Sequence, residues 1–294
     1  MNLRSCLLLA LATSCLASVP GVDASGGLGT EFLESWQWRR ADVRRGVGSE
    51  AITALAADRE GEVLAVGGEG GVSLFRNGAW QERLSRVGLV TDLAFAQDGT
   101  LWVGTPRRLW RYSSAGQLQQ QSPGQGEAAR FIHRIATLGA LTVVTTEAGA
   151  YVHGETRAWE RLGTDLPRSS GGAVALRWLP RARSESPGIA EVWLVVGGQL
   201  WRTTLREGGP VPEAPSFASA RVVTIPDVPV AEVPSQIVLG LKGVDVLLVY
   251  ARMLVYRTGA ETPWRVVRPV GVPGASFQWL APAGSLFWLG TAGG

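Results

Sequence analysis

Short apolar runs separated by glycine-containing turns recur along most of this chain. In the first clear instance, an apolar run begins at Ile52 and ends in the turn Asp58-Arg-Glu-Gly61, and two further runs follow at 63–67 and 70–75. Trp80 marks a fourth run. Runs this short, bounded by Gly and Asp, predict β-strands joined by tight turns in which the glycine adopts a positive φ. The pattern therefore predicts a unit of four antiparallel strands, with the tryptophan-bearing strand at the outer edge.

The same order of strands and turns repeats at an interval of roughly forty residues. Gly99 ends the first run of a second copy 38 positions after Gly61, and Gly104 follows Gly67 by 37 positions. No helix is predicted after the first two dozen residues. The strands expected in the later copies lie at 90–99, 101–104 and 109–112; at 131–138, 141–146 and 150–153 with Trp159; at 173–179, 192–197, 200–204 and 221–225; at 236–241, 244–250 and 253–256 with Trp264; and at 277–281 and 286–291.

A repeat of this length predicts an all-β fold, a β-propeller of about six to seven four-stranded blades in which the last blade is incomplete. A β-sandwich or an open barrel also contains short strands at regular spacing. The recurrence of the same glycine and aromatic positions favours the propeller, because a sandwich has no need to reuse one strand pattern. Residues 34–38 are expected to supply an outer strand to the incomplete blade, and the natural chain is expected to continue past Gly294.

The N-terminal residues resemble an export signal. Arg4 precedes an apolar stretch that opens at 7–11, and Val22-Asp23-Ala24 places small residues before a cleavage point. Residues 1–24 are therefore predicted to be a signal peptide and residues 25–294 the propeller domain. In an alternative interpretation, Leu11 to Cys15 form a lipoprotein processing box, and Cys15 would carry a lipid anchor. The predicted location is periplasmic or secreted, or, on the alternative, lipid-anchored at the outer or inner membrane.

Composition mainly removes function classes from consideration. Cys6 and Cys15 are the only cysteines and both lie in the predicted leader, so the mature domain would have no thiol for a disulfide, a metal site or a nucleophile. The chain is 46% hydrophobic and 18% charged, which is typical of a folded domain and not of a disordered one. No transmembrane segment is predicted in the mature chain, because its strongest apolar run, 244–250, is short and contains Asp245.

The basic residues do not form the pattern of a nucleic-acid-binding protein. The formal net charge is +3, and of the 28 basic residues only Lys242 is a lysine. Nucleic-acid-binding proteins gather their charge on one face or segment, whereas these arginines are scattered. The exception is a group that we interpret as a solvated loop or edge strand, with contact to an anionic surface as the alternative: Arg39, Arg40, Arg44 and Arg45. No nucleic-acid partner is predicted.

The second copy of the repeat resembles a known family. Its motifs are Gly88-Leu89-Val90, Gln97-Asp98-Gly99, Leu101-Trp102-Val103-Gly104-Thr105 and Leu109-Trp110-Arg111-Tyr112, and Phe287 to Thr291 match again. They are similar to the two-component regulator propeller repeat, the periplasmic sensor module of hybrid histidine kinases. The resemblance implies a propeller that senses a small ligand or a protein partner, in a chain truncated here. It is weak over 130–260, where Trp-x-Gly-Thr gives way to Val144-Thr145-Thr146, and it carries over no ligand-binding residue.

Enzymatic alternatives require residues that this chain places poorly. The segment Asp98-Gly99-Thr100-Leu101-Trp102 does not have the spacing of a sialidase Asp-box. The four tyrosines occupy strand positions typical of packing: Tyr112, Tyr151, Tyr250 and Tyr256. A propeller lyase, whose repeats also carry Gly-x-Leu-Trp, would need a positioned base such as His133 or His153. Ordinary strand histidines are the preferred interpretation, and no catalytic residue is assigned.

The remaining motifs indicate structure before chemistry. Gly67 to Gly71 lack the Lys and Ser/Thr of a phosphate-binding loop and are expected to form the turn between the second and third strands. No spacing of a metal site is present, so no metal and no cofactor are predicted. The 12 tryptophans are interpreted as packing between blades, with carbohydrate stacking as the alternative.

The predicted function is that of a non-enzymatic exported propeller. It would bind a ligand or a protein partner at one mouth of the central channel, where the strand ends of all blades converge. The family resemblance implies that it is the sensor part of a two-component regulatory system. A secreted lyase or glycosidase and a lipoprotein assembly scaffold are the alternatives.

Overall fold

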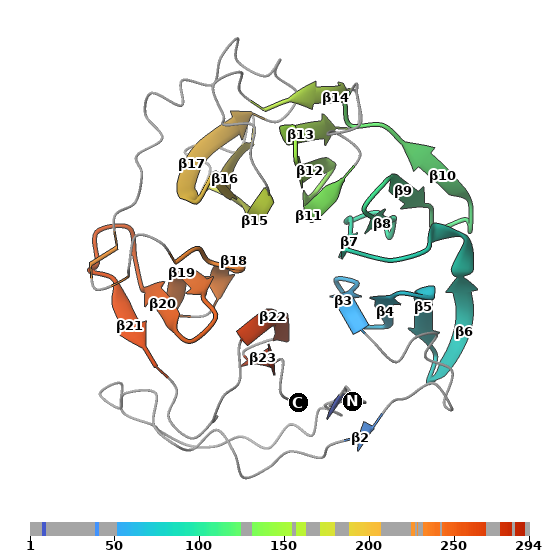
Figure 1. The fold of residues 1–294 in the computed structure, drawn as a ribbon, viewed down its shortest axis with the longest axis horizontal. Coiled ribbons are helices and arrows are strands. Elements are labelled where there is room, and N and C mark those ends of the chain that lie inside the picture. The colour runs from blue at the N-terminus through green and yellow to red at the C-terminus, as the bar shows by residue number, and fades with distance from the viewer. Residues whose placement is uncertain are drawn as a thin grey trace.

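The computed structural model is a ring of small antiparallel sheets around a central opening (Figure 1). It describes residues 52–124, 131–154, 157–162, 171–179, 188–206, 225–226, 228, 232–241, 243–268, 277–283 and 286–291, together with 8–9 and 39–40. Each sheet of the ring is a meander, so the chain completes one sheet before it begins the next. This topology makes the molecule an all-β propeller and rules out the β-sandwich, in which two large sheets would share the strands.

The described residues form five blades, and a two-stranded sheet follows the fifth. The blades consist of β3 Ile52–Ala57, β4 Val63–Gly68, β5 Gly71–Arg76 and β6 Ala79–Leu84; β7 Asp92–Phe95, β8 Leu101–Gly104, β9 Leu109–Tyr112 and β10 Leu118–Gln121; β11 Ile132–Leu138, β12 Leu141–Thr146, β13 Gly149–Gly154 and β14 Arg157–Arg161; β15 Gly171–Trp178, β16 Ile189–Val196 and β17 Gln199–Arg206; and β18 Gln236–Leu241, β19 Val244–Val249, β20 Leu254–Arg257 and β21 Arg265–Val267. The last sheet pairs β22 Phe277–Ala283 with β23 Leu286–Thr291.

The predicted total of six to seven four-stranded blades is wrong, because the described residues form five blades. The sixth copy, expected at 277–281 and 286–291, is described as a single pair of strands, β22 and β23. The repeat interval also varies: the inner strands of the first three blades begin 40 residues apart, at Ile52, Asp92 and Ile132, whereas those of the fourth and fifth begin 65 residues apart, at Gly171 and Gln236. Long connections in the fourth blade account for the longer interval. The outer strand predicted at 221–225 lies outside the described residues except for Ile225, and the strand predicted at 34–38 lies outside them entirely.

The N-terminal part is described only at two short strands. Leu8–Leu9 (β1) pairs antiparallel with Arg39–Arg40 (β2), which places two residues of the arginine cluster in a strand pair. Arg44 and Arg45 lie outside the described residues, as do most of the predicted signal peptide and Cys15. The part of the chain that is described includes no helix with the length and hydropathy of a membrane span; its one helical segment is the 3-10 turn η3 Ser85–Val87.

The hydrophobic core consists of layers between successive blades. Each blade has two apolar faces, and each face can be removed from water only by the neighbouring blade. Trp102 and Leu109 of the second blade pack against Ile132 and Val144 of the third. Equivalent layers join the other blades and the last sheet. Packing between blades is thereby confirmed for these tryptophans: Trp102, Trp110, Trp159, Trp178, Trp193, Trp201 and Trp264.

The glycine of the Trp-x-Gly-Thr motif is required by the following blade. A Cβ added to Gly104 would lie 2.7 Å from Cγ2 of Ile132, and one added to Gly67 would lie 2.5 Å from Cγ1 of Val90. Val90 and Ile132 stand at the entrance to the next blade, and their N–H groups donate to the preceding blade at 3.1 Å. The backbones of adjacent blades thus approach at a point where the earlier blade has no room for a side chain.

Between the third and fourth blades the same contact is reversed. Thr145 stands at the position of Gly104, and Gly171 stands at the position of Ile132, because Gly171 pairs with Val196 as Ile132 pairs with Thr146. The Thr145 hydroxyl donates to the carbonyl of the following residue, Gly172, at 3.1 Å. The next residue of the motif keeps its role, because the Thr146 hydroxyl accepts from Ala148 N–H at 3.0 Å as the motif threonine of the second blade does in its own turn. The motif is weak at 144–146 because a larger residue, Thr145, replaces the motif glycine, and a glycine replaces the large residue of the following blade.

Candidate functional site

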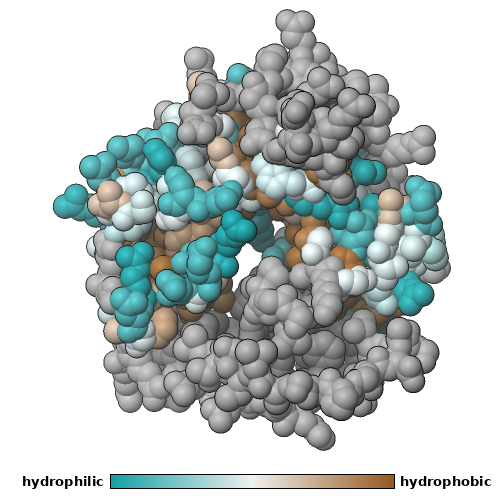
Figure 2. All heavy atoms as spheres, turned by 180° about the vertical axis from the view of Figure 1, so that it is seen from behind, coloured by the Kyte–Doolittle hydropathy of each residue, from teal (hydrophilic) through white to brown (hydrophobic). Residues whose placement is uncertain are grey.

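A cavity of about 490 Å³ occupies the central channel. Figure 2 shows the opening at the centre of the ring, with hydrophilic and hydrophobic residues beside it. The first strands of all five blades and Phe277 of β22 contribute to the lining, which is largely aliphatic. Five polar side chains interrupt it: Thr53, Asp92, Arg134, Ser235 and Gln236. The channel thus contains a cavity that is lined mainly by inner strands, whereas the site predicted from the sequence lies at one mouth of the channel, where strand ends converge.

Several inner strands enter the channel through a β-bulge. The register shifts between Ile52 and Ala54 and again between Ile132 and Arg134. The Thr53 hydroxyl at the first bulge donates to the Val90 carbonyl at 2.5 Å, and Thr91 in the second blade donates to the Ile132 carbonyl at 2.6 Å. These hydroxyls join each blade to the next, and the bulge directs the residue that follows toward the channel.

Asp92 and Arg134 are the charged residues that this geometry brings into the channel. Asp92 Oδ2 accepts a hydrogen bond from the Ile135 N–H at 2.6 Å, which connects β7 to β11. Arg134 Nη1 donates to the carbonyl of His133 at 2.9 Å. Burial raises the pKa of Asp92 from 3.8 to about 6. The positive charge of Arg134 and two backbone N–H groups lower the pKa, but their effect is smaller than that of burial. The carboxyl group therefore changes its charge in mildly acidic solution.

Replacing Asp92 with asparagine is expected to stabilise the protein above pH 6 and to flatten its pH profile. Since the folded protein binds the Asp92 proton more tightly than the unfolded chain, the wild type loses stability as the pH rises from about 4 to about 6. Asparagine retains an oxygen for the Ile135 N–H and has no charge to desolvate. We expect a gain of about 1 kcal/mol at pH 8, below the limit of about 3 kcal/mol set by the pKa shift, because water in the channel screens the charge. Urea unfolding at pH 4.5 and pH 8 measures both values, and an unchanged slope in the variant would contradict the assignment.

The two histidines do not form a joint site. His133 lies at the bulge of β11, beside the pair Ile132–Thr146, whereas His153 pairs with Thr142 at the opposite end of the same blade. His153 packs between the rings of Trp102 and Trp159, with centroid distances of 5.8 and 5.0 Å. Burial lowers the pKa of both imidazoles. The geometry gives neither histidine a partner that would make it part of a shared acid–base pair.

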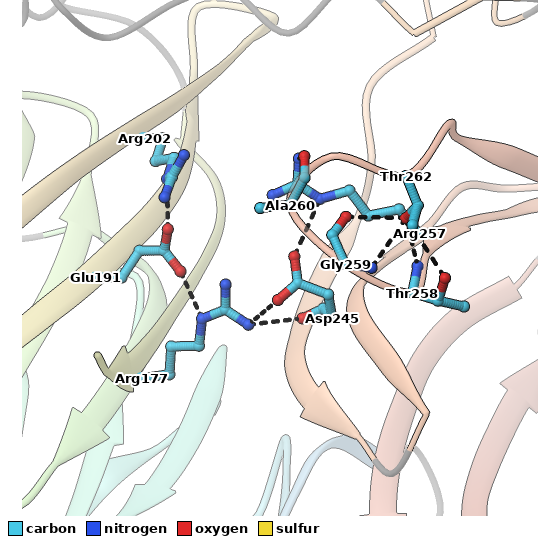
Figure 3. A network of polar contacts seen from close by, with 9 residues as sticks. All are labelled: Arg177, Glu191, Arg202, Asp245, Arg257, Thr258, Gly259, Ala260 and Thr262. Carbon is cyan, nitrogen blue, oxygen red and sulfur yellow. Dashed lines mark hydrogen bonds and ion pairs between the residues drawn. The ribbon is translucent and has the colours of Figure 1, made fainter. Parts of the chain in front are cut away.

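The largest charged cluster joins the fourth and fifth blades. Figure 3 shows Arg177 between Glu191 of its own blade and Asp245 of the next. Arg177 Nε donates to Glu191 Oε2 at 2.5 Å, Arg202 binds the other Glu191 oxygen, and Arg177 Nη1 reaches the Asp245 carbonyl at 3.0 Å. The Glu191 side chain is 0% exposed. Burial alone would lower the pKa of Arg177, but hydrogen bonds and charges from Asp245 and Glu191 outweigh it and raise the pKa, so the guanidinium stays charged.

Arg257 extends this cluster into the apolar layer. Its guanidinium lies 5.2 Å from the ring centroid of Trp193 and 5.1 Å from that of Trp264, and its Nε is 3.1 Å from Asp245 Oδ2. The rings on both sides and the carboxylate compensate the charge, although Nε and Nη2 of Arg257 make no hydrogen bond within the described residues. The cluster lies between packed sheets and does not line the channel cavity, so we assign it to blade cohesion.

The other candidates from the sequence have structural roles. The Asp98 carboxylate accepts from the N–H and the hydroxyl of Thr100, both at 2.9 Å, which makes Asp98-Gly99-Thr100 a turn. Tyr250 is buried in the layer between the fourth and fifth blades, and burial raises its pKa to about 12. Within the described ranges no three His, Cys, Asp or Glu side chains form a metal site.

Sequence reasoning missed Asp92 and Arg134. Both lie inside runs that were read as ordinary apolar strands, at 90–99 and 131–138. The available signal was a charged residue two positions after the aliphatic residue that opens each run, Val90 or Ile132. The sequence does not show which way such a residue faces. In a regular strand the side chains alternate between the two faces, and a bulge changes that alternation.

No family model matches the chain, and no curated protein matches it in sequence. Solved structures do match. A catalytically inactive histidine variant of virginiamycin B lyase from Staphylococcus aureus, with quinupristin, is 11% identical with a TM-score of 0.61, over 87% of this chain and 82% of that one. The WD40 propeller of Doa1 is 11% identical with a TM-score of 0.60, over 88% and 80%.

The extracellular domain of a hybrid two-component system protein from B. thetaiotaomicron is also similar. It is 16% identical with a TM-score of 0.55, over 84% of this chain and 32% of that one, so this chain spans about a third of that domain. The three proteins differ in what their names describe, and identities this low establish the architecture only. The chain is therefore a β-propeller.

Proposed function

We propose that this chain is an exported, non-enzymatic propeller that binds a small ligand in its central channel, as the sensing module of a two-component regulatory system. One observation carries the binding proposal: two charged groups, Asp92 and Arg134, stand in a cavity of about 490 Å³ with otherwise largely aliphatic walls. Charged groups in an apolar cavity are costly unless they serve a purpose, and ligand sites typically combine apolar walls with a few convergent polar groups.

Export and the regulatory role rest on different support. The signal-peptide pattern of residues 1–24 supports secretion or a periplasmic location, with a lipid anchor at Cys15 as the alternative. The Trp-x-Gly-Thr repeats and the similarity to an extracellular domain of a two-component protein support the sensing role. Non-enzymatic binding is proposed because His133 and His153 lie at opposite ends of one blade.

Replacing Leu55 with tryptophan is expected to abolish ligand binding. Leu55 lines the channel, is only partly buried and belongs to none of the buried layers between the described blades, so we expect a larger ring to fill part of the cavity. A panel of small carboxylic acids, amines, amides and sugars would be screened by ligand-observed NMR. We expect hits with the wild type that Leu55→Trp loses by at least tenfold in affinity, which is about 1.4 kcal/mol.

The control variant is Ile189→Trp, which adds a similar ring at an exposed position of β16 outside the channel and should retain every hit. Equal loss in both variants, or hits that survive Leu55→Trp, would place the ligand elsewhere. The same wild-type sample should leave quinupristin intact. Turnover that disappears in His133→Ala or His153→Ala would instead establish the lyase.

A further inference from the structure

We propose that the ligand of the channel is a small molecule with an α-carboxylate, a neighbouring N–H donor and an apolar side chain, that is, an apolar amino acid or the C-terminal residue of a short peptide. This inference rests on the proposed function and specifies its ligand. Three features of the channel carry it: an arginine without a carboxylate partner, an aspartate that can accept a further hydrogen bond, and aliphatic residues in the lining.

Arg134 differs from the other partly buried arginines of this propeller. Arg177 and Arg202 bind Glu191, and Arg257 binds Asp245. Among the described residues no carboxylate oxygen lies within ion-pair distance of Arg134, whose one hydrogen bond is to the His133 carbonyl. A guanidinium carries five N–H donors in a planar fork that matches both oxygens of a carboxylate. Most of its donors are therefore available to an anionic group that enters the channel.

Asp92 provides the complementary acceptor on the neighbouring blade. Its Oδ2 accepts from the Ile135 N–H at 2.6 Å, and the backbone N–H of Leu93 also acts on the carboxyl group. The two oxygens of an ionised carboxylate accept about four hydrogen bonds in total, so the group can accept a further donor. Ile135 directly follows Arg134, so the bond to Asp92 holds the two charged residues near each other across the blade interface. An α-amino or amide N–H beside a ligand carboxylate has the polarity that Asp92 accepts.

The walls select the rest of the ligand. Leu55, Leu93, Ile135, Val174 and Ile237 line the cavity from all five blades and have no polar side-chain atoms. An alkyl side chain of the ligand can contact these residues without leaving a polar atom unpaired against them. The volume of about 490 Å³ lies toward the small end of ligand sites, which suits one or two amino-acid residues.

The test uses four probes on the full chain by isothermal titration calorimetry. N-acetyl-L-leucine carries all three groups, L-leucine replaces the amide with an ammonium, N-acetyl-L-leucinamide has no carboxylate, and 4-methylpentanoate has no N–H donor. We expect N-acetyl-L-leucine or L-leucine to bind best, and the amide and 4-methylpentanoate to bind at least tenfold more weakly. The order of the first two shows whether the ligand is a peptide terminus or a free amino acid.

The variants assign each preference to a residue. In Arg134→Gln the affinity for N-acetyl-L-leucine should fall at least tenfold, so that this acid binds no better than N-acetyl-L-leucinamide. In Asp92→Asn the advantage over 4-methylpentanoate should shrink. Arg252→Gln, which removes an exposed arginine beside the channel-lining Ala251, should change neither, and circular dichroism verifies that each variant is folded.

The outcomes separate this inference from the proposed function. Equal affinity for acid and amide in the wild type, or no effect of Arg134→Gln, would overturn the carboxylate assignment alone, provided that some probe or panel compound still binds in a manner sensitive to Leu55→Trp. If no compound binds, or if Leu55→Trp changes nothing, the channel itself is not the site and both proposals fall.

Discussion

Replacing Glu191 with glutamine is expected to lower the free energy of unfolding by about 1–3 kcal/mol. Glu191 is fully buried and accepts from Arg177 with one oxygen and from Arg202 with the other. Glutamine can offer its oxygen to only one of them and turns an N–H₂ group toward the second. The cost is limited because the Arg202 side chain is 45% exposed to water and Arg177 keeps its contact with Asp245.

Chemical unfolding at pH 7 measures this difference. Glu69→Gln is the matched control, because Glu69 is exposed in the turn between β4 and β5, and its effect should stay within about 0.5 kcal/mol. Similar small values for both variants would show that the buried cluster contributes little to the stability of the fourth and fifth blades.

A methyl group added at Gly104 is expected to destabilise the protein by about 1–3 kcal/mol. The new Cβ would lie 2.7 Å from Cγ2 of Ile132 and 3.1 Å from its Cβ, which are too close for carbon atoms in contact. Ile132 is fully buried, so the second and third blades would have to separate or repack. The change acts on the interface between blades and leaves the hydrogen bonds within the blade in place.

A double-mutant cycle tests that explanation. Gly104→Ala should cost at least about 1 kcal/mol less in an Ile132→Ala background than in the wild type, because the clashing methyl group is gone. Gly259→Ala is the control, since its added Cβ would meet only Thr262 Cγ2 at an ordinary 3.6 Å. Additive effects of the two alanines would place the cost of Gly104→Ala inside its own blade.

Where a turn depends on glycine, the sequence predicts the structure well. Gly61 and Gly99 were expected at positive φ, and they adopt 75° and 78°. The turn expected from Gly67 to Gly71 lies between the end of β4 and the start of β5. These features depend on the backbone of a few neighbouring residues, so a local pattern suffices to find them.

Elements without an apolar pattern were not found. The outer strand β10, Leu118–Gln121, consists of one leucine and three glutamines, and no fourth strand was predicted for that blade. Its pairing with β9, in which Leu118 lies opposite Tyr112, defines it. An outer strand has one side open to solvent, so hydrogen bonding determines its position more than side-chain burial does.

The charged residues were unpredictable for a different reason. Arg177 and Asp245 are 68 positions apart, and Asp92 meets the Ile135 N–H across 43. The long connections of the fourth blade and the bulges of β3 and β11 determine how the strands are placed. Their placement decides which arginine lies beside a carboxylate and which one faces the channel. A single sequence specifies strand chemistry, but it does not reveal these long-range registers.

The exchange of small and large residues at Thr145 and Gly171 has an evolutionary consequence. A copy of the first or second blade placed fourth would bring a β-branched residue, Ile52 or Val90, to the position of Gly171, and a copy of the third blade placed second would bring a threonine against Ile132. The blades are therefore not interchangeable within the ring. Duplication or shuffling of one module now requires a matching change in its neighbour, which preserves the order of the modules even while their sequences diverge.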